Sequence, residues 1–150
     1  MKTPSRLPAY RQSLAGNLLA AREAVMEPLR PILRTAGLTE QQWRVLRVLT
    51  DEGPNDPSGL ASAGLLHPPS VARILHDLAK RKLIVRKSDP ADGRRKMIAV
   101  TPQGRALVEQ TAGAVAMVLA RYTKAFGKKR LQALQDELAE LVRVVGAPSA

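Results

Sequence analysis

The side chains of this sequence that could do chemistry are cations gathered in one short stretch. Between residues 70 and 96 the chain holds nine basic and three acidic residues, a net charge of +6 within a total of +11. The basic residues are Arg73, Lys80, Arg81, Lys82, Arg86, Lys87, Arg94, Arg95 and Lys96. Such a concentration of positive charge predicts a polyanionic partner, either nucleic acid or an anionic membrane surface.

Few other chemistries are open to the chain. It has no cysteine, which excludes disulfides, thiolate metal sites and cysteine nucleophiles. Its two histidines, nine residues apart, belong to no metal-binding motif, and neither a Gly-x-Ser-x-Gly elbow nor a Walker loop is present. Four aromatic residues are too few to stack the bases of single-stranded nucleic acid. We therefore expect no enzyme, no metal and no cofactor.

The sequence also gives no sign of a membrane-spanning or secreted protein. No stretch approaches the roughly 18 apolar residues that a membrane-spanning helix needs, and the N-terminus lacks the apolar core of a signal peptide. This pattern favours a cytoplasmic protein. Binding to a membrane surface is disfavoured as well, because it needs a basic amphipathic helix and the basic stretch here includes a hairpin.

The basic stretch is expected to be folded, because apolar residues recur between its charges. A capping box predicts a helix over about 39–51. An Asp-Pro pair begins a short helix over 56–64, and a further helix begins with Pro69 in its first turn. Two β-prone runs, 83–87 and 97–101, flank a loop with proline and Asp-Gly, which predicts a hairpin with a charged tip.

Helical spacing of apolar residues predicts long helices on both sides of this region. Apolar residues at helical spacing over about 13–33 predict one long first helix that ends by Gly37, and Pro28 and Pro31 should kink or break its last turns. A long helix begins at Pro102 and breaks near Phe126, and a last amphipathic helix covers 131–145. The apolar stripes of the first and last helices exceed what one small domain can cover, so both are candidate dimerisation surfaces.

The order of these elements describes a winged helix-turn-helix. In that fold a recognition helix enters the major groove, and a hairpin called the wing reaches the DNA backbone or the minor groove. We predict a single domain, mainly α with a small β-hairpin (α+β). Its winged helix-turn-helix covers about 38–101, between dimerisation helices at about 10–36 and 102–146.

Four segments of the chain resemble one family of regulators. They are Leu38–Leu46, Pro69–Leu75, Asp89–Arg95 and Val100–Gly104. Together they resemble the MarR (multiple antibiotic resistance regulator) family, and the likeness covers nearly the whole chain. Together with residues 21–24 and 30–33, the first segment more narrowly resembles the regulators of homoprotocatechuate-degradation operons within that family.

The resemblance implies a function more specific than charge alone does. Members of the family are homodimers that bind palindromic operators in double-stranded DNA and usually repress transcription. They release DNA when a small molecule, often an aromatic acid, binds between the dimerisation and DNA-binding regions. The resemblance therefore implies a sequence-specific homodimeric repressor released by a small aromatic carboxylate.

Carried over to this sequence, the resemblance implies two DNA-reading elements. Pro69, Ser70 and Arg73 fall in the first turns of the recognition helix, where Arg73 could pair bidentately with guanine. In the wing, Asp92 would orient Arg94, whose guanidinium would enter the minor groove. Phosphate contacts are expected from four further cations, although any of them could be merely solvated. These cations are Arg86, Lys87, Arg95 and Lys96.

Two positions depart from the family's pattern. Pro68 stands where a hydroxyl helix cap is common, and Lys82 stands where a helix-ending glycine is usual. We therefore expect the local geometry at both ends of the recognition helix to differ from that of other members.

The resemblance and the residue types together suggest an effector site at three residues. Arg22 matches an arginine that pairs with the effector carboxylate in relatives responsive to aromatic acids, with a plain surface arginine as the alternative. Trp43 could wall an aromatic pocket or belong to the core. His67 could bind an effector or sense protonation, with a helix cap or a phosphate contact as the alternatives.

The positive charge leaves a second function open. At +11, a sequence-independent architectural DNA-binding protein would also bind any duplex in a salt-sensitive manner. Competition by non-specific DNA distinguishes such a protein from a regulator that reads an operator.

Overall fold

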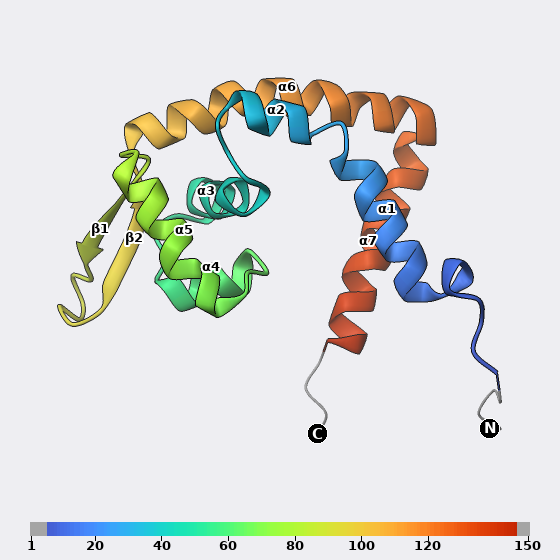
Figure 1. The fold of residues 1–150 in the computed structure, drawn as a ribbon, viewed down its shortest axis with the longest axis horizontal. Coiled ribbons are helices and arrows are strands. Elements are labelled where there is room, and N and C mark those ends of the chain that lie inside the picture. The colour runs from blue at the N-terminus through green and yellow to red at the C-terminus, as the bar shows by residue number, and fades with distance from the viewer. Residues whose placement is uncertain (1–5, 147–150) are drawn as a thin grey trace. The chain divides into compact units, whose positions relative to one another are not determined.

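The computed structural model describes residues 6–146 as helices with one hairpin, which confirms the predicted fold class (Figure 1). The chain divides into two compact units at residue 112. The first holds η1 (Tyr10–Gln12), α1 (Leu14–Met26), α2 (Arg30–Thr35), α3 (Glu40–Glu52), α4 (Pro57–Ala63), α5 (Pro68–Lys80), β1 (Ile84–Ser88), β2 (Lys96–Val100) and the start of α6 (Pro102–Phe126). The second holds the rest of α6 and α7 (Lys128–Val145).

The winged region, residues 38–101, begins with the capping box that the sequence predicts. The Thr39 hydroxyl accepts a hydrogen bond from the Gln42 amide at 3.1 Å, and the Gln42 side chain accepts one from the Thr39 amide at 3.1 Å. The next helix, α4, is capped by Asp56, whose carboxylate accepts from the Gly59 amide at 2.6 Å. Both helix starts therefore satisfy amides that would otherwise lack partners.

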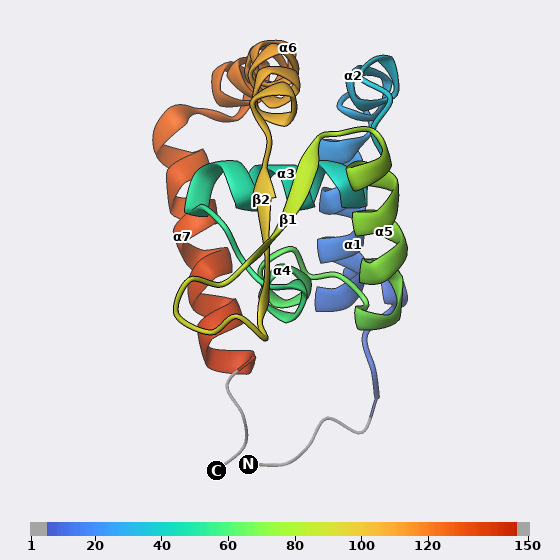
Figure 2. The ribbon, with the colours of Figure 1, turned by 90° about the vertical axis from the view of Figure 1, so that its left-hand side faces the viewer.

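The wing is an antiparallel pair of strands that is bonded to the segment before α4. β1 pairs with β2 from Ile84 opposite Val100 to Ser88 opposite Lys96, and Figure 2 shows the two strands side by side. The main chain of Asn55 adds two hydrogen bonds to Ile98, of 3.0 and 2.8 Å. The middle of β2 is thereby fixed to the residue that precedes the cap of α4.

The core of the winged region is almost entirely aliphatic. Its buried side chains are Leu38, Trp43, Val45, Leu46, Leu49, Leu60, Ala61, Leu66, Val71, Leu75, Leu78, Leu83, Ile84 and Ile98. On α5, Val71, Leu75 and Leu78 are buried at helical spacing, so the other face of this helix is left to solvent. Burying each such side chain stabilises the fold by about 1.5–3 kcal/mol.

The prediction of one long first helix is wrong. The structure has two helices, α1 and α2, separated by a turn over 27–29. Pro28 lies in this turn, and Pro31 lies in the first turn of α2. Proline has no amide hydrogen and its ring collides with the preceding turn of a helix, so it is tolerated at a helix start and disrupts a helix interior. The two prolines end one helix and begin another.

Pro68 and Lys82 mark the two ends of the recognition helix α5. The helix begins at Pro68, so that Pro69 lies in its first turn as the sequence predicts, and His67 stands at the cap position without a capping side-chain hydrogen bond. After the helix, Lys82 has φ +60°, a left-handed conformation that costs a non-glycine residue about 1–2 kcal/mol. The neighbouring Arg81 donates to the Gly37 carbonyl at 2.6 Å and so fixes this end of the helix.

The second unit consists of the end of α6 and of α7, and the chain breaks between these two helices as the sequence predicts. α6 ends at Phe126, Gly127 has φ +100°, and α7 starts at Lys128, three residues before the predicted 131. No residue of α7 is buried within the described chain. Apolar side chains of this helix are instead exposed, with Leu134 at 43% and Val142 at 72%.

Candidate nucleic-acid interface

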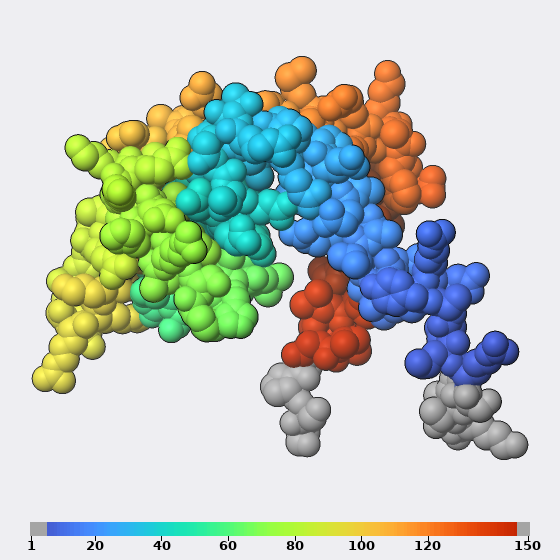
Figure 3. All heavy atoms as spheres, in the orientation of Figure 1, coloured from blue at the N-terminus to red at the C-terminus, as the bar shows by residue number. Residues whose placement is uncertain are grey.

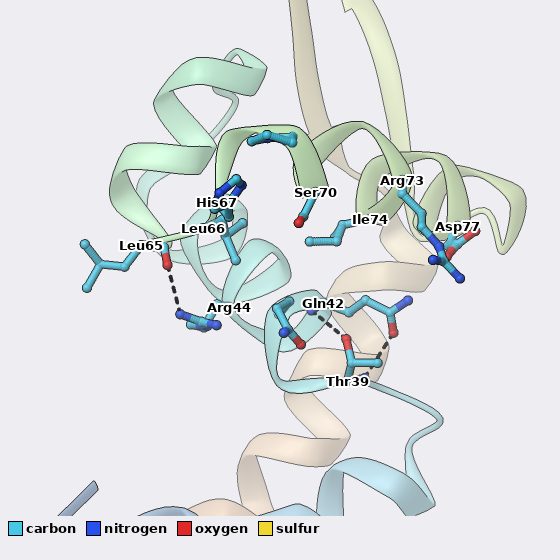
Figure 4. Close-up of a pocket in the computed structure, with 12 residues that line it drawn as sticks. Thr39, Gln42, Arg44, Leu65, Leu66, His67, Ser70, Arg73, Ile74 and Asp77 are labelled. Carbon is cyan, nitrogen blue, oxygen red and sulfur yellow. Dashed lines mark hydrogen bonds between the residues drawn. The ribbon is translucent and has the colours of Figure 1, made fainter. Parts of the chain in front are cut away.

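The turn between α4 and α5 is held by an arginine from α3. The Arg44 guanidinium donates to the carbonyls of Gly64 and Leu65 at 3.0 and 3.3 Å, and Figure 4 shows the bond to Leu65. Leu65 itself has φ +50°. Because these carbonyls lie at the end of α4, the cation satisfies acceptors that the helix leaves free. The angle between α4 and the recognition helix is thereby fixed.

The three residues predicted for the recognition helix lie together at its start. Pro69, Ser70 and Arg73 are all exposed, one or two residues away from the buried positions of α5. The Arg73 guanidinium makes no hydrogen bond or ion pair with any residue in the range 6–146. An arginine that is free and exposed on a rigid helix can meet a base edge or a phosphate.

A cavity of about 630 Å³ lies between this helix and the start of α3. Figure 4 shows Ser70, Arg73 and Asp77 of α5 around it, opposite Thr39 and Gln42 of α3. His67, at the end of the turn, also lines it. The predicted effector residue His67 thus shares this cavity with three residues predicted to bind DNA, Pro69, Ser70 and Arg73, whereas Arg22 and Trp43 are not among its lining residues.

The tip of the wing is shaped by aspartates that accept bonds from the main chain. The Asp89 carboxylate accepts from the Ala91 amide at 2.8 Å, and the Asp92 carboxylate accepts from the Arg94 amide at 3.0 Å. Asp92 therefore orients the backbone of Arg94, and its carboxylate forms no ion pair with the Arg94 guanidinium within the described residues. That guanidinium is exposed, and in Figure 3 the yellow tip projects from the surface of its unit.

The other four predicted wing cations differ in what they contact. Arg86 and Lys87 lie on β1, exposed and without an ion pair inside the described chain, and Lys96 donates only a 3.4 Å hydrogen bond to Ser88. Arg95 is engaged: its Nε donates to Asp56 at 2.9 Å, and its Nη2 donates to the same oxygen. Sequence reasoning did not find this partner, which is 39 residues away.

The predicted effector residue Arg22 belongs to a network of four charges. It lies 2.7 Å from Glu40, which Arg30 also contacts at 2.7 Å, and Arg30 is 3.0 Å from Glu23. Hydrogen bonds from the two guanidinium groups, that of Arg22 first, lower the pKa of Glu40 below its ordinary value. The network joins α1 and α2 to the first residue of α3.

Trp43, the second predicted effector residue, is 8% exposed. Its ring lies beneath the Arg47 guanidinium, with 5.6 Å between the guanidinium carbon and the ring centroid. Arg47 also lies 2.9 Å from Asp51. The sequence analysis did not single out Arg47, although its spacing of four residues from Trp43 on one helix could have indicated the contact.

Metal and membrane sites were not expected, and two observations bear on them. Among residues 6–146 there is no group of three or more histidine or acidic residues that could hold a metal ion. Within the same part of the chain, no helix combines the length and the apolar character that crossing a bilayer requires.

Comparison with known proteins agrees with this geometry. Residues 36–95 match a family model described as the MarR family. The HTH-type transcriptional regulator FarR of Neisseria gonorrhoeae is 36% identical over 130 residues, which are 87% of this chain and 89% of FarR. The homoprotocatechuate degradative operon repressor of Escherichia coli is 32% identical over 130 residues, which are 87% of this chain and 88% of the repressor.

Solved structures show the same fold. NadR in complex with 4-hydroxyphenylacetate has a TM-score of 0.82 and 35% identity, covering 96% of this chain and 99% of NadR. The repressor CouR bound to a 23-mer DNA duplex has a TM-score of 0.80 and 26% identity, covering 92% of this chain and 99% of CouR. One of these two relatives was thus solved with an aromatic acid and the other with DNA.

Proposed function

This chain belongs to the MarR family of DNA-binding transcriptional regulators, and we propose that it is a homodimeric repressor that a small aromatic acid releases from its operator. The observation that carries the proposal is the pair of exposed, unpaired arginines, Arg73 on the recognition helix and Arg94 at the wing tip. Arg73 lies on a helix and Arg94 in the loop of the wing, and each can reach a different groove of one duplex.

In this proposal the two arginines read DNA and the other cations fix its position. Arg73 pairs with a guanine in the major groove, with Ser70 at a nearby phosphate or base. Arg94 enters the minor groove, where its charge is attracted most strongly at narrow A·T-rich steps. Arg86, Lys87 and Lys96 contact phosphates, adding affinity and salt dependence without sequence preference.

The proposed dimer accounts for apolar surface that the single chain leaves open. Leu134, Leu138 and Val142 follow one another on α7 at helical spacing and are 43%, 37% and 72% exposed. On α1, Leu14 and Leu19 are 61% and 51% exposed. A soluble monomer rarely leaves such stripes uncovered. A second copy related by twofold symmetry covers them and presents two recognition helices about 34 Å apart, one turn of DNA.

The proposed effector is an aromatic carboxylate that binds beside Trp43. NadR, at 35% identity, was solved with a compound of this class, 4-hydroxyphenylacetate. Arg47 contacts the Trp43 ring, and Arg22 pairs with Glu40, three residues before Trp43 on α3. Both arginines already have carboxylate partners, Glu40 for Arg22 and Asp51 for Arg47. A ligand carboxylate would replace one of these partners as a charge-assisted acceptor. Replacing Glu40 would open the link between α1 and the start of α3, and so disturb the winged region.

One experiment tests repression and release in sequence. Binding is measured by fluorescence anisotropy on a fragment from upstream of the protein's own gene, and on a scrambled fragment of equal composition, both with excess non-specific DNA. Preference for the upstream fragment supports a sequence-specific regulator, whereas equal affinity indicates an architectural DNA-binding protein. Addition of 4-hydroxyphenylacetate should then lower the affinity, and an unchanged affinity would count against this ligand class.

A further inference from the structure

Two adjacent arginines of the wing have opposite surroundings. Arg94 extends into solvent with its guanidinium unpaired within the described chain. Arg95 turns back, with Nε and Nη2 both donating to one oxygen of Asp56 and Nη1 lying 3.9 Å from Asp89. Both residues were expected from the sequence to contact DNA. The structure indicates different roles for the two arginines, because Arg95 already pairs with two carboxylates of its own chain, those of Asp56 and Asp89.

Asp56 performs two tasks with its two carboxylate oxygens. Oδ1 caps α4 by accepting from the Gly59 amide, and Oδ2 accepts both bonds from Arg95. These hydrogen bonds lower the pKa of the Asp56 carboxyl below its ordinary value, and the bond from the Gly59 amide contributes more than those from Arg95. The residue before it, Asn55, bonds the middle of β2 through Ile98. The wing is therefore attached to the start of α4 at the middle of its strands and again near its tip.

We propose that Arg95 is a positioning residue, which fastens the wing tip to Asp56 and so aims the neighbouring Arg94 at the minor groove, in place of making a phosphate contact of its own. This inference rests on the proposed function, since it concerns how the wing meets an operator. The wing is a two-stranded ribbon, which has little stability without further packing. A tip that is fixed before binding loses less conformational freedom when it meets DNA.

The shape of the guanidinium group is central to this role. Nε and Nη2 of its planar fork both donate to Oδ2 of Asp56, and a lysine ammonium, which has one nitrogen, cannot reproduce this pair of donors. A phosphate contact, by contrast, is largely a point-charge interaction, which lysine also makes. Arg95→Lys keeps the charge and removes the fork, so this single substitution separates the two roles.

Asp56→Asn gives a second test, in which the two roles predict changes of opposite sign. Asparagine caps a helix about as well as aspartate, so α4 keeps its cap while the ion pair with Arg95 is lost. If Arg95 binds phosphate, the substitution removes a competing negative charge and should tighten DNA binding. If Arg95 positions the wing, the same substitution should weaken DNA binding despite the more positive protein.

The experiment measures affinity for the upstream fragment over a range of salt concentrations. The proteins are the full-length wild type, Arg95→Ala, Arg95→Lys, Asp56→Asn and the double variant Asp56→Asn with Arg95→Ala. Arg86→Ala serves as the control for a cation expected at a phosphate. Thermal melting and sedimentation confirm that each variant is folded and has the association state of the wild type.

We expect Arg95→Ala and Asp56→Asn each to weaken binding about fivefold, and the double variant to be no weaker than the worse single one, because interacting residues are not additive. Arg95→Lys should also weaken binding, and the slope of log affinity against log salt should stay as in the wild type. Arg86→Ala should reduce the magnitude of that slope by about 0.9, the value for one phosphate contact.

Three results would overturn the proposal. They are tighter binding by Asp56→Asn, wild-type affinity in Arg95→Lys, and a salt slope reduced by about 0.9 in Arg95→Ala, which would mark a phosphate contact. Failure of the proposed function would appear elsewhere, in the wild-type protein, as equal affinity for the upstream and scrambled fragments.

Discussion

The winged region and α7 both carry apolar residues at regular spacing, but these side chains are buried in the winged region and exposed on α7. In the winged region, four leucines are each 0% exposed: Leu46, Leu60, Leu75 and Leu78. On α7 no residue is buried within the described chain, and Val142 and Val145 are 72% and 71% exposed. The hydrophobic effect rewards apolar surface only when something covers it. The winged region is therefore stabilised within one chain, and α7 needs a second copy.

The largest effect should come from charging the apolar stripe of α7. The double substitution Leu134→Lys with Leu138→Lys places two charges where the dimer would bury apolar surface. Sedimentation should show a monomer, and operator affinity should fall by at least about 100-fold, because linking two half-site contacts typically raises avidity by that factor or more. Ala133→Lys, on another face of the same helix, should leave both properties unchanged. A dimer that survived the double substitution would contradict this role for α7.

The second prediction concerns the core of the winged region. Leu75→Ala empties a position that is 0% exposed, and it should lower the free energy of unfolding by about 2–5 kcal/mol. Chemical denaturation should give this loss at every protein concentration. For Leu138→Ala on α7, the loss should instead grow as the protein is diluted, since a dimer interface is stabilised by mass action. If the loss of unfolding free energy depended on protein concentration in the same way in both variants, the distinction between a core within one chain and a dimer interface would be contradicted.

The third prediction concerns a substitution that should leave both the winged region and α7 folded. Arg94→Ala removes an exposed guanidinium that has no partner within the described chain, so melting temperature and dimerisation should not change. Operator affinity should fall by about tenfold, in keeping with about 1–3 kcal/mol for a good contact to a base. Unchanged operator binding would defeat the assignment of Arg94 to the minor groove.

The smallest effect should appear on acidification. The pKa of Glu40 is lowered by Arg22 and Arg30, so its ion pairs stabilise the fold fully above the unfolded value near 4.5, and this stabilisation is lost as the pH falls through the lower folded value. Denaturation midpoints of the wild type and Glu40→Gln should therefore differ at pH 7 and converge as the pH falls below the lowered pKa of Glu40 in the folded protein. Glu140→Gln, in an exposed pair on α7, should match the wild type at both pH values.

Local features of the fold could be predicted from the sequence where neighbouring residues decide them. The capping box at Thr39 and Gln42 and the break at Gly127 needed only short spacing. The separation of α1 from α2 is also local, since Pro28 and Pro31 indicated a kink or a break in the last turns of what was expected to be one helix. The charged faces of α5 and the wing followed from helical and strand periodicity.

Other features depend on contacts that no short pattern contains. Asp56 and Arg95 are 39 residues apart, so only the folded chain shows that one wing arginine is bound and its neighbour is free. The burial of Trp43 to 8% likewise depends on how α3 packs. Arg22 was predicted as a free ligand for a carboxylate, and the structure shows that Glu40 already holds it. Whether an effector displaces Glu40 stays a prediction.

The central claim is that two copies of the winged region bind one symmetric site. A DNA footprint combined with a measurement of binding stoichiometry tests this claim most directly. The protein is titrated at micromolar concentration onto the fragment upstream of its own gene. The account predicts two protected half-sites one turn of DNA apart, about 34 Å, occupied by two chains. A single protected half-site with one chain bound, or equal protection of a scrambled fragment, would contradict it.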